Sequence, residues 1–439
     1  MFKVNNIALL KRRLVYFITS IYILSLFFED YFKFELEFLR FSIVEIIFIT
    51  ILFLTLLIHK LNFIKFIFKF DKKNILEIII YTILVLKIIK YLLNFQNYYN
   101  LYELLIWIYM LSIYIVFKFY LISDKNLVNY IENSFITVSL IISIHILYLF
   151  LLYKLGYESN GFWTIKDTTY YPYAGTSSIN FKSIFRDYNQ AAHLVAPGFL
   201  FLLSRFNNKL ISTLLIIFYF AVMYLMKSKF LIIFFGILGI YLITKNLNVK
   251  NAKLTKVFLL SSIIGLVLFY IIITHLIIIE KGMINSSNFD LFKKYYFTDF
   301  VISLNNYDIY GSLFLKLKYT VIELANSYNY ILFDSSNYFN HEIVLKNFDH
   351  HTDPHSVYFG ALANYGIIGF LVFLGFPIYI VLEYLKNLNL KETYKDSLIY
   401  FLIIVMIFIE AIIIDLFHTQ FIWIIFAMYI FKVYFKKIV

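Results

Sequence analysis

Residues 257–279, VFLLSSIIGLVLFYIIITHLIII, form one uninterrupted apolar run that contains no acidic residue, lysine or arginine. A helix that crosses the ~30 Å hydrocarbon core of a bilayer needs about 20 such residues. The whole chain of 439 residues has the same character, with 62% hydrophobic residues, 15% charged residues and a mean hydropathy of +0.78. A soluble domain is roughly 45–50% apolar and about 25% charged. The composition therefore excludes a soluble enzyme and predicts a polytopic helical membrane protein.

Working outward from this run, the chain divides into about 12 apolar segments separated by short polar stretches. These segments are 14–28, 41–58, 74–95, 103–122, 134–153, 190–204, 210–226, 230–244, 257–279, 356–383, 397–415 and 417–431. Two hydrophilic interruptions are long, 154–189 and 280–354. Within the second, residues 312–331 have apolar side chains at helical spacing and predict a helix in the membrane interface. We predict an all-α fold, with one membrane domain over residues 1–439 and two large loops.

The distribution of lysine and arginine predicts the orientation of the chain. With the N-terminus in the cytoplasm and alternating spans, most basic residues of the short loops fall inside, as the positive-inside rule requires. The short outside loops hold only Lys33, Arg40, Lys227 and Lys229. Both termini are then cytoplasmic and both long loops lie outside, in the periplasm of a Gram-negative cell. The net charge of +12 fits this rule and contact with anionic lipids, so no nucleic-acid partner is expected.

Several kinds of chemistry are excluded by what the sequence lacks. The chain has no cysteine, which rules out disulfides, thiolate metal sites and a cysteine nucleophile. It has no P-loop, dinucleotide fingerprint or kinase motif. Lys11, Arg12 and Arg13 precede the first apolar segment, but no small-residue cleavage site follows, so this segment is expected to remain as an anchor. An enzyme on the outer face must use a substrate that carries its own activation, such as a sugar linked through diphosphate to a polyprenyl lipid.

The densest polar cluster, HHTDPHS at 350–356, runs directly into the tenth apolar segment. Pro354 suits the position before a helix, which places His355 and Ser356 at the helix N-terminus. Free N–H groups and the helix dipole favour an anion there. Gly366 and Gly369 follow at a spacing that permits close helix packing.

His355-Ser356, nine residues, and then Gly366-Ile-Ile-Gly369 resembles the signature of the O-antigen ligase and O-antigen polymerase superfamily. Its members carry a histidine followed by Asn, Ser or Gln, nine residues, and Gly-x-x-Gly, after a large periplasmic loop. The stretch 185–191, FRDYNQA, is similar to their Phe-x-Asp-x-Asn-x-x-Ala segment, and Ser228-Lys229 stands where many members have Ser-Arg. Gln190 occupies the leucine position of the Arg-x-x-x-Leu element described for ligases, which favours a polymerase over a ligase.

The resemblance implies a C-type glycosyltransferase fold. Such a protein transfers or polymerises glycan units from undecaprenyl diphosphate on the periplasmic face of the inner membrane, without metal or cofactor. Its partners would be the lipid-linked oligosaccharide, an acceptor glycan or lipid A core, the bilayer and a chain-length regulator. The main chemical requirement is to neutralise the leaving diphosphate and to accept a proton from the acceptor hydroxyl. The catalytic residues expected for these tasks are His355, Arg186 and Lys229.

Further polar residues near the outer ends of the segments are expected to bind substrate. These are Asn189, His193, Ser356, Lys227, Lys87, Asp415 and His418. Ordinary roles remain open for several of them. Lys87, its neighbour Lys90 and Lys229 also suit snorkelling to the interface, and Asn189 and His193 suit capping and packing. Glu410 is a further ionisable residue at the end of a span. An ionisable residue within a membrane segment is a candidate functional residue.

Alternatives from other classes stay open as well. His350, His351, Asp353 and His355 have a compressed spacing that would allow a metal site. An O-antigen ligase that attaches the polymer to the lipid A core is the closest alternative to the polymerase. A protein O-glycosyltransferase would usually be longer at its C-terminus. A transporter or flippase would also have about 12 spans, but it would need polar residues deep in several of them.

Overall fold

The structure is a computed structural model of the whole chain. It describes residues 2–28, 33–36, 39–67, 75–93, 98–157, 167–171, 176–181, 183, 188–228, 230–246, 252–280, 297–311, 357–388, 393–412 and 419–435.

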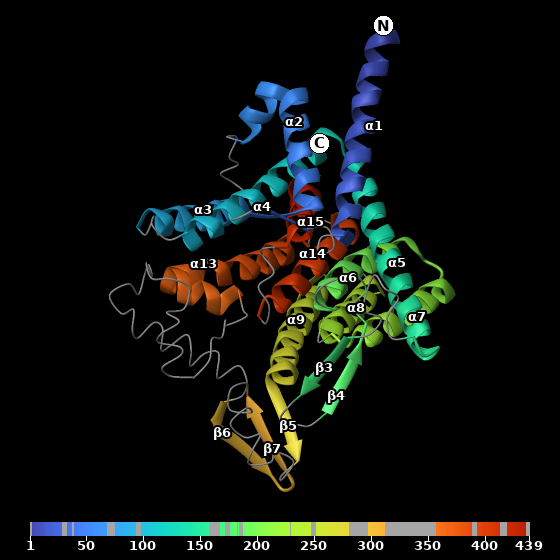
Figure 1. The fold of residues 1–439 in the computed structure, drawn as a ribbon, viewed down its shortest axis with the longest axis vertical. Helices are drawn as coiled ribbons and strands as arrows, with labels where there is room; N and C mark the ends of the chain where they lie inside the picture. Colours follow the sequence, from blue (N-terminus) through green and yellow to red (C-terminus); the bar gives the residue numbers. More distant parts are fainter. Residues whose placement is uncertain are drawn as a thin grey trace.

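Twelve α-helices are present in the described part of the chain, and each overlaps one of the predicted apolar segments (Figure 1). They are α1 (Phe2–Ser25), α2 (Ile43–Ile67), α3 (Ile75–Leu93), α4 (Tyr98–Ser123), α5 (Leu127–Lys154), α6 (Tyr188–Arg205), α7 (Lys209–Met226), α8 (Phe230–Asn246), α9 (Ala252–His275), α13 (Val357–Asn387), α14 (Thr393–Glu410) and α15 (Gln420–Ile430). The helix α1 begins at Phe2, twelve residues before the predicted apolar segment, so it continues beyond the apolar run toward the N-terminus.

Six of the described helices are long and apolar enough to cross a membrane, which supports a helical membrane protein. These stretches are Ile43–Ile67, Glu103–Ser123, Leu127–Lys154, Lys209–Met226, Lys253–Ile272 and Tyr365–Lys386. Three shorter apolar stretches, Phe230–Lys245, Ser397–Glu410 and Gln420–Val433, lie in α8, α14 and α15. Every residue of α15 is buried, so this helix is covered by protein on all sides.

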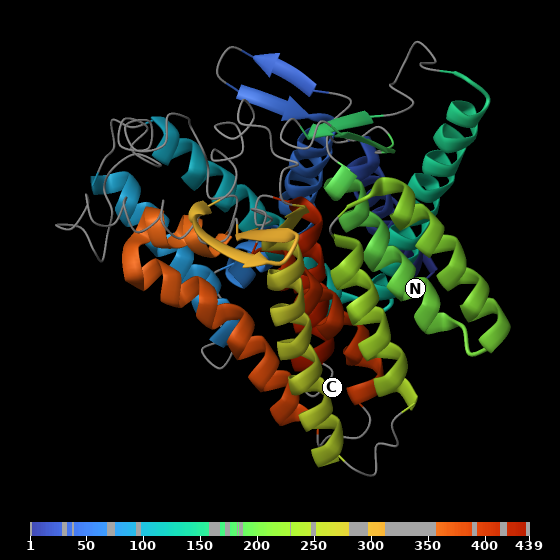
Figure 2. The same cartoon turned by 90° about the horizontal axis from the view of Figure 1, so that it is seen from below.

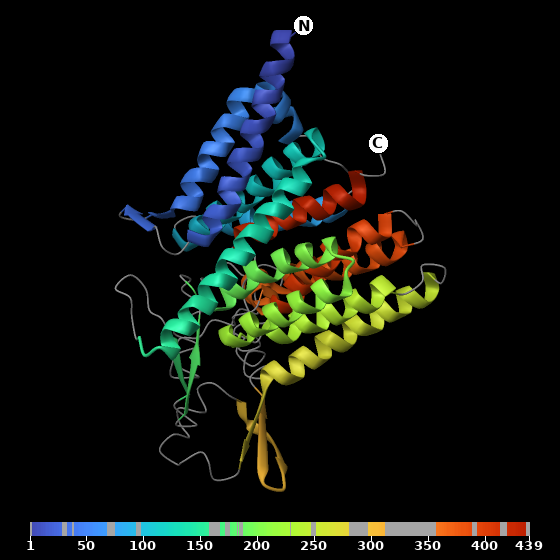
Figure 3. The ribbon, with the colours of Figure 1, turned by 90° about the vertical axis from the view of Figure 1, so that its right-hand side faces the viewer.

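The helices α14 and α15 lie at the centre of the bundle (Figure 3). On one side α15 packs against α4, and on the other α14 packs against α8, α6 and α9. The pair α5 and α6 makes the most extensive helix contact, and α13 packs across α3 and beside α14 (Figure 2). The small side chains of α6 allow this close approach, because a Cβ at Gly198 would meet the backbone oxygen of Phe135 in α5.

Three small antiparallel sheets accompany the helices, which the all-α prediction did not include. β1 (Lys33–Leu36) pairs with β2 (Leu39–Ser42), and β3 (Asp167–Tyr171) pairs with β4 (Thr176–Asn180). β7 (Tyr307–Gly311) is the central strand between β5 (Leu276–Glu280) and β6 (Phe297–Leu304). The sheets β1–β2 and β3–β4 and the strands β6 and β7 lie in segments predicted to be outside the cytoplasm. The strand β5 overlaps the end of the apolar segment predicted at 257–279, where the helix ends at His275, earlier than predicted. The sheets of β3–β4 and β5–β7 project from the end of the molecule opposite the N-terminus (Figure 1).

The described strands occupy parts of both long loops. The predicted interfacial helix at 312–331 lies outside the described residues. The orientation of the chain in the membrane and the total number of spans stay predictions from the charge pattern.

Candidate functional site

The structure describes four of the residues that the sequence predicts for the site. His193, Lys227 and Lys87 are described with their side chains, and Asn189 is placed as the second residue of α6 by its backbone alone. The remaining predicted residues lie outside the described residues. They are His355, Arg186, Lys229, Ser356, Asp415 and His418.

Five helix ends meet in one place, and three of them adjoin the predicted catalytic residues in the sequence. The ring of His193 in α6 packs edge-on against Phe230, the first residue of α8, with ring centroids 4.7 Å apart. The backbone N–H of Val357, the first residue of α13, donates to the carbonyl of Ala411 at the end of α14 over 3.0 Å. Tyr270, near the end of α9, bonds to Glu410, the last residue of α14.

At this convergence, helix ends that adjoin three sequence motifs lie close together, although the motifs are far apart in the sequence. Lys229 directly precedes Phe230, His355 is two residues before Val357, and Arg186 is two residues before the start of α6. The described helices thus form a common frame for the three segments. The positions of these three side chains themselves remain a prediction.

A buried polar cluster of three residues, His193, Glu410 and Tyr270, lies at the centre of this frame. The Nε2 atom of His193 lies 3.4 Å from Oε1 of Glu410, and the hydroxyl of Tyr270 donates a hydrogen bond to Oε2. His193 is 5% exposed, Glu410 1% and Tyr270 0%. Among the described residues, Nε2 of His193 makes no hydrogen bond. Burying a carboxylate costs several kcal/mol unless it is paired or hydrogen-bonded, and Glu410 has the imidazole of His193 and the hydroxyl of Tyr270 beside it.

The helix α13 breaks at Gly366, the first glycine of the Gly-x-x-Gly motif, nine residues after the helix begins at Val357. Gly366 has φ 65° and ψ −160°, a backbone conformation that only glycine adopts readily. A Cβ at Gly369 would lie far inside van der Waals contact of the Tyr365 Cβ and 3.0 Å from the carbonyl oxygen of Ala361. The sequence predicted close packing between helices at these glycines. The described contacts at Gly369 instead lie within α13, across the break.

A second buried cluster surrounds Tyr365 and contains Lys87. Nζ of Lys87 lies 2.9 Å from Oε2 of Glu103, and the same ammonium lies over the rings of Trp107 and Tyr365 at 5.4 and 5.5 Å. Lys90 lies over Tyr365 at 5.3 Å. Both lysines are 6% exposed and lie against protein groups, which favours a buried role over snorkelling to solvent. The first turns of α13, residues 357–365, connect this cluster to the one at Glu410.

Lys227 and Ser228 form the turn between α7 and α8. Lys227 adopts a left-handed conformation at the C-cap of α7, with φ 53° and its N–H directed to the carbonyl of Tyr224. Its side chain is exposed. Ser228 is buried, and its hydroxyl accepts a hydrogen bond from the Phe230 N–H over 3.2 Å, as an N-cap residue does. This cap fixes the start of α8 beside His193.

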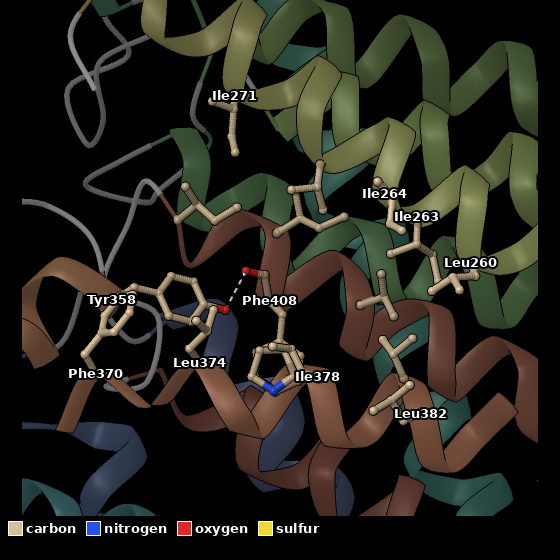
Figure 4. Close-up of a pocket in the computed structure, with 16 residues that line it drawn as sticks. Leu260, Ile263, Ile264, Ile271, Tyr358, Phe370, Leu374, Ile378, Leu382 and Phe408 are labelled. Atoms are coloured by element: carbon tan, nitrogen blue, oxygen red, sulfur yellow. Dashed lines mark hydrogen bonds between the residues drawn. The ribbon is translucent and has the colours of Figure 1, made fainter. Parts of the chain in front are cut away.

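An apolar groove of about 540 Å³ lies between α9, α13 and α14, next to the convergence of the helix ends (Figure 4). It extends along α9 from Leu260 to Ile271, which is about 16 Å at 1.5 Å per residue. The hydroxyl of Tyr358 donates to the Phe408 carbonyl over 3.1 Å, which leaves the lining apolar. On α14, Ile409 and Ile412 line the groove, and Glu410 stands between them in the sequence.

The described residues contain no group of three or more His, Asp or Glu side chains arranged to hold a metal ion. His350, His351 and Asp353 lie outside the described residues, so the metal alternative at that loop stays open.

No family model, no curated protein and no solved structure matches the chain.

Proposed function

We propose that the chain is a membrane glycosyltransferase. It takes glycan units from a polyprenyl diphosphate, such as undecaprenyl diphosphate, and transfers them to the hydroxyl of an acceptor glycan on the extracytoplasmic face. A repeat-unit polymerase of O-antigen or another surface polysaccharide is the favoured form. A ligase that attaches the polymer to the lipid A core is the alternative.

The observation that carries the proposal is the apolar groove and the place where it ends. A groove of about 540 Å³ with an apolar lining, in a chain of membrane-crossing helices, suits a hydrocarbon chain and does not suit a sugar. Its length of about 16 Å covers about half of a ~30 Å hydrocarbon core. At one end, Tyr358 and Ile412 lie next in sequence to Val357 and Ala411, where the helix ends converge (Figure 4). A lipid tail in the groove would bring its head group toward that junction.

The chemistry of the transfer matches the residue types that flank the junction. Diphosphate is a good leaving group, so the main need is to neutralise the charge that develops on it. Arg186 and Lys229 are proposed to supply the neutralising positive charge, and His355, two residues before α13 in the sequence, is proposed to bind the diphosphate or to accept the hydroxyl proton. No resident metal or cofactor is required by this scheme.

A transporter or flippase is the second class. The apolar lining of the groove favours the transferase, because a polar glycan in transit would have to cross a surface without hydrogen-bonding groups.

Deletion of the gene, followed by gel analysis of surface glycan and of lipid-linked glycan, tests the proposal. Loss of a polymerase leaves a single repeat unit on the lipid core. Loss of a ligase leaves long polymer on the carrier lipid. Unchanged surface glycan together with unchanged lipid-linked glycan would contradict a transferase. Repeat units that accumulate on the cytoplasmic face alone would support a flippase.

The groove itself is tested by filling it. Ile264 lines the groove, whereas Leu268, one turn further on α9, is not among its lining residues. The two side chains are similarly exposed, at 51% and 55%, so they differ chiefly in their position relative to the groove. Ile264→Trp is expected to reduce glycan transfer by occupying the lipid site, whereas Leu268→Trp places the same side chain on the outer surface and is expected to be tolerated. Equal activity of the two variants would remove the groove from the site.

A further inference from the structure

We propose that His193 is the proton acceptor of the transfer reaction, held in place by Glu410, which is held in turn by Tyr270. This inference rests on the proposed function and assigns a step within it. The three residues come from α6, α14 and α9, and they meet where the predicted catalytic segments adjoin the described helices.

The geometry resembles that of a histidine oriented by a carboxylate. Oε1 of Glu410 lies 3.4 Å from Nε2 of His193, and the Tyr270 hydroxyl donates to the other carboxylate oxygen. The contact is electrostatic and not a hydrogen bond, but a carboxylate beside one ring nitrogen favours a proton on that nitrogen, and we assign Nδ1 as the site that accepts a proton. The edge-on ring of Phe230, at 4.7 Å, limits rotation of the imidazole. Glu410 and Tyr270 therefore act as positioning residues.

Burial makes the pair suited to exchange a proton. A buried carboxylate alone would be costly, but the pair can take up a proton on the imidazole and become an ion pair without adding net negative charge to the interior. In water the same pair would gain little from its Coulomb attraction, whereas an interior of low dielectric strengthens it. The transient imidazolium is then stabilised by Glu410 at the moment when it forms.

In the proposed reaction, proton transfer accompanies formation of the new glycosidic bond. The acceptor oxygen forms a bond to the anomeric carbon of the donor glycan, and the bond from that carbon to the diphosphate oxygen breaks with its electron pair on the diphosphate. The hydroxyl proton goes to Nδ1 of His193 and then to water. This leaves the diphosphate to be bound by the cations near it, and it gives His355 the diphosphate-binding role.

Other titratable groups come from the helices packed around His193. Glu410 and Tyr270 face it from α14 and α9. Tyr358 of α13 is bonded to the Phe408 carbonyl. From the helices that pack on α6, α5 brings His145, whose Nδ1 lies 2.6 Å from the Ser183 hydroxyl, and α7 brings Tyr219, which is bonded to Ser139. A pH dependence assigned to His193 must therefore be separated from one that arises at His145.

The test measures the pH profile of glycan transfer in right-side-out membrane vesicles from the complemented deletion strain, with endogenous lipid-linked glycan as donor. The wild-type rate is expected to rise with external pH, because a general base accepts a proton only in its unprotonated form. Glu410→Gln removes the negative charge that stabilises the protonated imidazole, so the rising limb of the pH profile is expected to move to lower pH and the maximal rate to drop. His193→Gln is expected to lose about 10²–10⁴-fold in rate.

Tyr270→Phe is the milder variant if Glu410→Gln fails to accumulate. It removes one hydrogen bond to the carboxylate. We expect it to shift the rising limb of the pH profile in the same direction as Glu410→Gln, but by a smaller amount. His145→Gln and Glu132→Gln are the matched controls, since Glu132 lies on α5 and bonds to Arg205 away from the cluster. Both controls are expected to keep the wild-type limb.

The outcomes separate this inference from the proposed function. If wild-type protein restores glycan and both Glu410→Gln and Tyr270→Phe keep the wild-type limb, the cluster is structural only and the inference is wrong. A limb that moves in His145→Gln instead assigns the titration to His145. If wild-type protein restores no glycan, the proposed function itself fails.

Discussion

Tyr365 packs over Gly369 across the break in α13, so closely that a single methyl group at position 369 would collide with the Tyr365 Cβ. The same tyrosine lies under the ammonium groups of Lys87 and Lys90. The Gly-x-x-Gly spacing thus has two separate physical reasons. Gly366 provides the left-handed backbone of the break, and Gly369 provides the space for the side chain that contacts the buried lysines.

Gly369→Ala is expected to destabilise the protein. The added Cβ would overlap Tyr365 and press on the Ala361 carbonyl at 3.0 Å, so the break in α13 would have to open at a cost of about 1–3 kcal/mol. Gly375 is the matched control, because it lies in the same helix and a Cβ there meets no atom within 4 Å. Gly375→Ala should be neutral or slightly stabilising. Thermal unfolding in detergent measures both, and equal melting temperatures would contradict the packing seen at Gly369.

The helical content was largely predictable, because long apolar runs are a strong signal. The structure has a helix at each predicted segment, including α3, which carries the charged residues Glu77, Lys87 and Lys90. The limits of α1 were not predictable, since its first residues are mixed in polarity and no break separates them from the apolar run. The short strands were also missed, because hairpins of this size depend on local turn chemistry and not on a long periodic pattern.

The candidate site shows where sequence reasoning ends. The sequence marked His193 and Glu410 separately, each as a polar residue near a span end. Their pairing depends on α6 and α14 packing together, and no local pattern records a contact between residues so far apart. Tyr270 and Tyr365 were missed entirely, since one tyrosine among many in an apolar helix carries no signal. The rule that buried charges are paired would have been enough to ask for a partner of Glu410.

The ion pair of Lys87 and Glu103 is expected to show strong coupling in a double-mutant cycle. The Lys87 and Glu103 side chains are 7% and 16% exposed, so the attraction is only weakly screened. Lys87→Met and Glu103→Gln should each destabilise the protein, and the double variant should lose about 1–3 kcal/mol less than the sum of the two. Denaturant unfolding measures the cycle. The more exposed pair of Arg205 and Glu132 is the control, with an expected coupling of about 0.2–1 kcal/mol. Equal coupling in both pairs would contradict the burial argument.

The contact between α1 and the turn after α4 is expected to give the protein a defined acid dependence. Arg12 and Tyr16 donate hydrogen bonds to Asp124. Partial burial alone would raise the pKa of Asp124, but the hydrogen bonds from Tyr16 and Arg12 outweigh it and hold the pKa below its usual value. Because the folded pKa is the lower one, the contact stabilises the protein at neutral pH, and this stabilisation is lost as the pH falls through that value.

Asp124→Asn should therefore melt at a lower temperature than wild type at neutral pH, and the difference should shrink below about pH 4. Thermal unfolding in detergent over a series of pH values measures this. Added salt should shrink the difference as well, because the pair is partly exposed. A difference that persists unchanged in acid would mean that the aspartate acts through its shape and not its charge.

Substitutions of Lys229 distinguish between two roles for this residue, a cation that binds phosphate and an anchor at the membrane interface. If it binds the leaving diphosphate, Lys229→Arg should keep glycan transfer, while Lys229→Ala and Lys229→Glu should lose about 10²–10³-fold, since a lost cation leaves developing charge unscreened in a dry pocket. Lys245 supplies the control, because it is an exposed lysine at the other end of α8 and is not predicted for the site, so Lys245→Ala is expected to keep activity. Surface-glycan gels of the complemented deletion strain measure all variants. Equal activity of the three Lys229 variants would assign the residue to the interface.

His355 is expected to act directly at the diphosphate, while His351 only shapes the loop before Pro354. The two histidines differ in how rigidly the neighbouring backbone is held. His355 is two residues from Val357, whose N–H is tied to the Ala411 carbonyl at 3.0 Å, whereas His351 lies before the proline, and a reacting group needs a rigid support. His355→Ala should abolish glycan transfer without loss of protein from the membrane, and His351→Ala should be mild. Transfer should also survive a chelator. If EDTA stops the reaction and divalent metal restores it, or if both variants are equally damaging, the cluster at 350–355 binds a metal and the assignment of His355 is wrong.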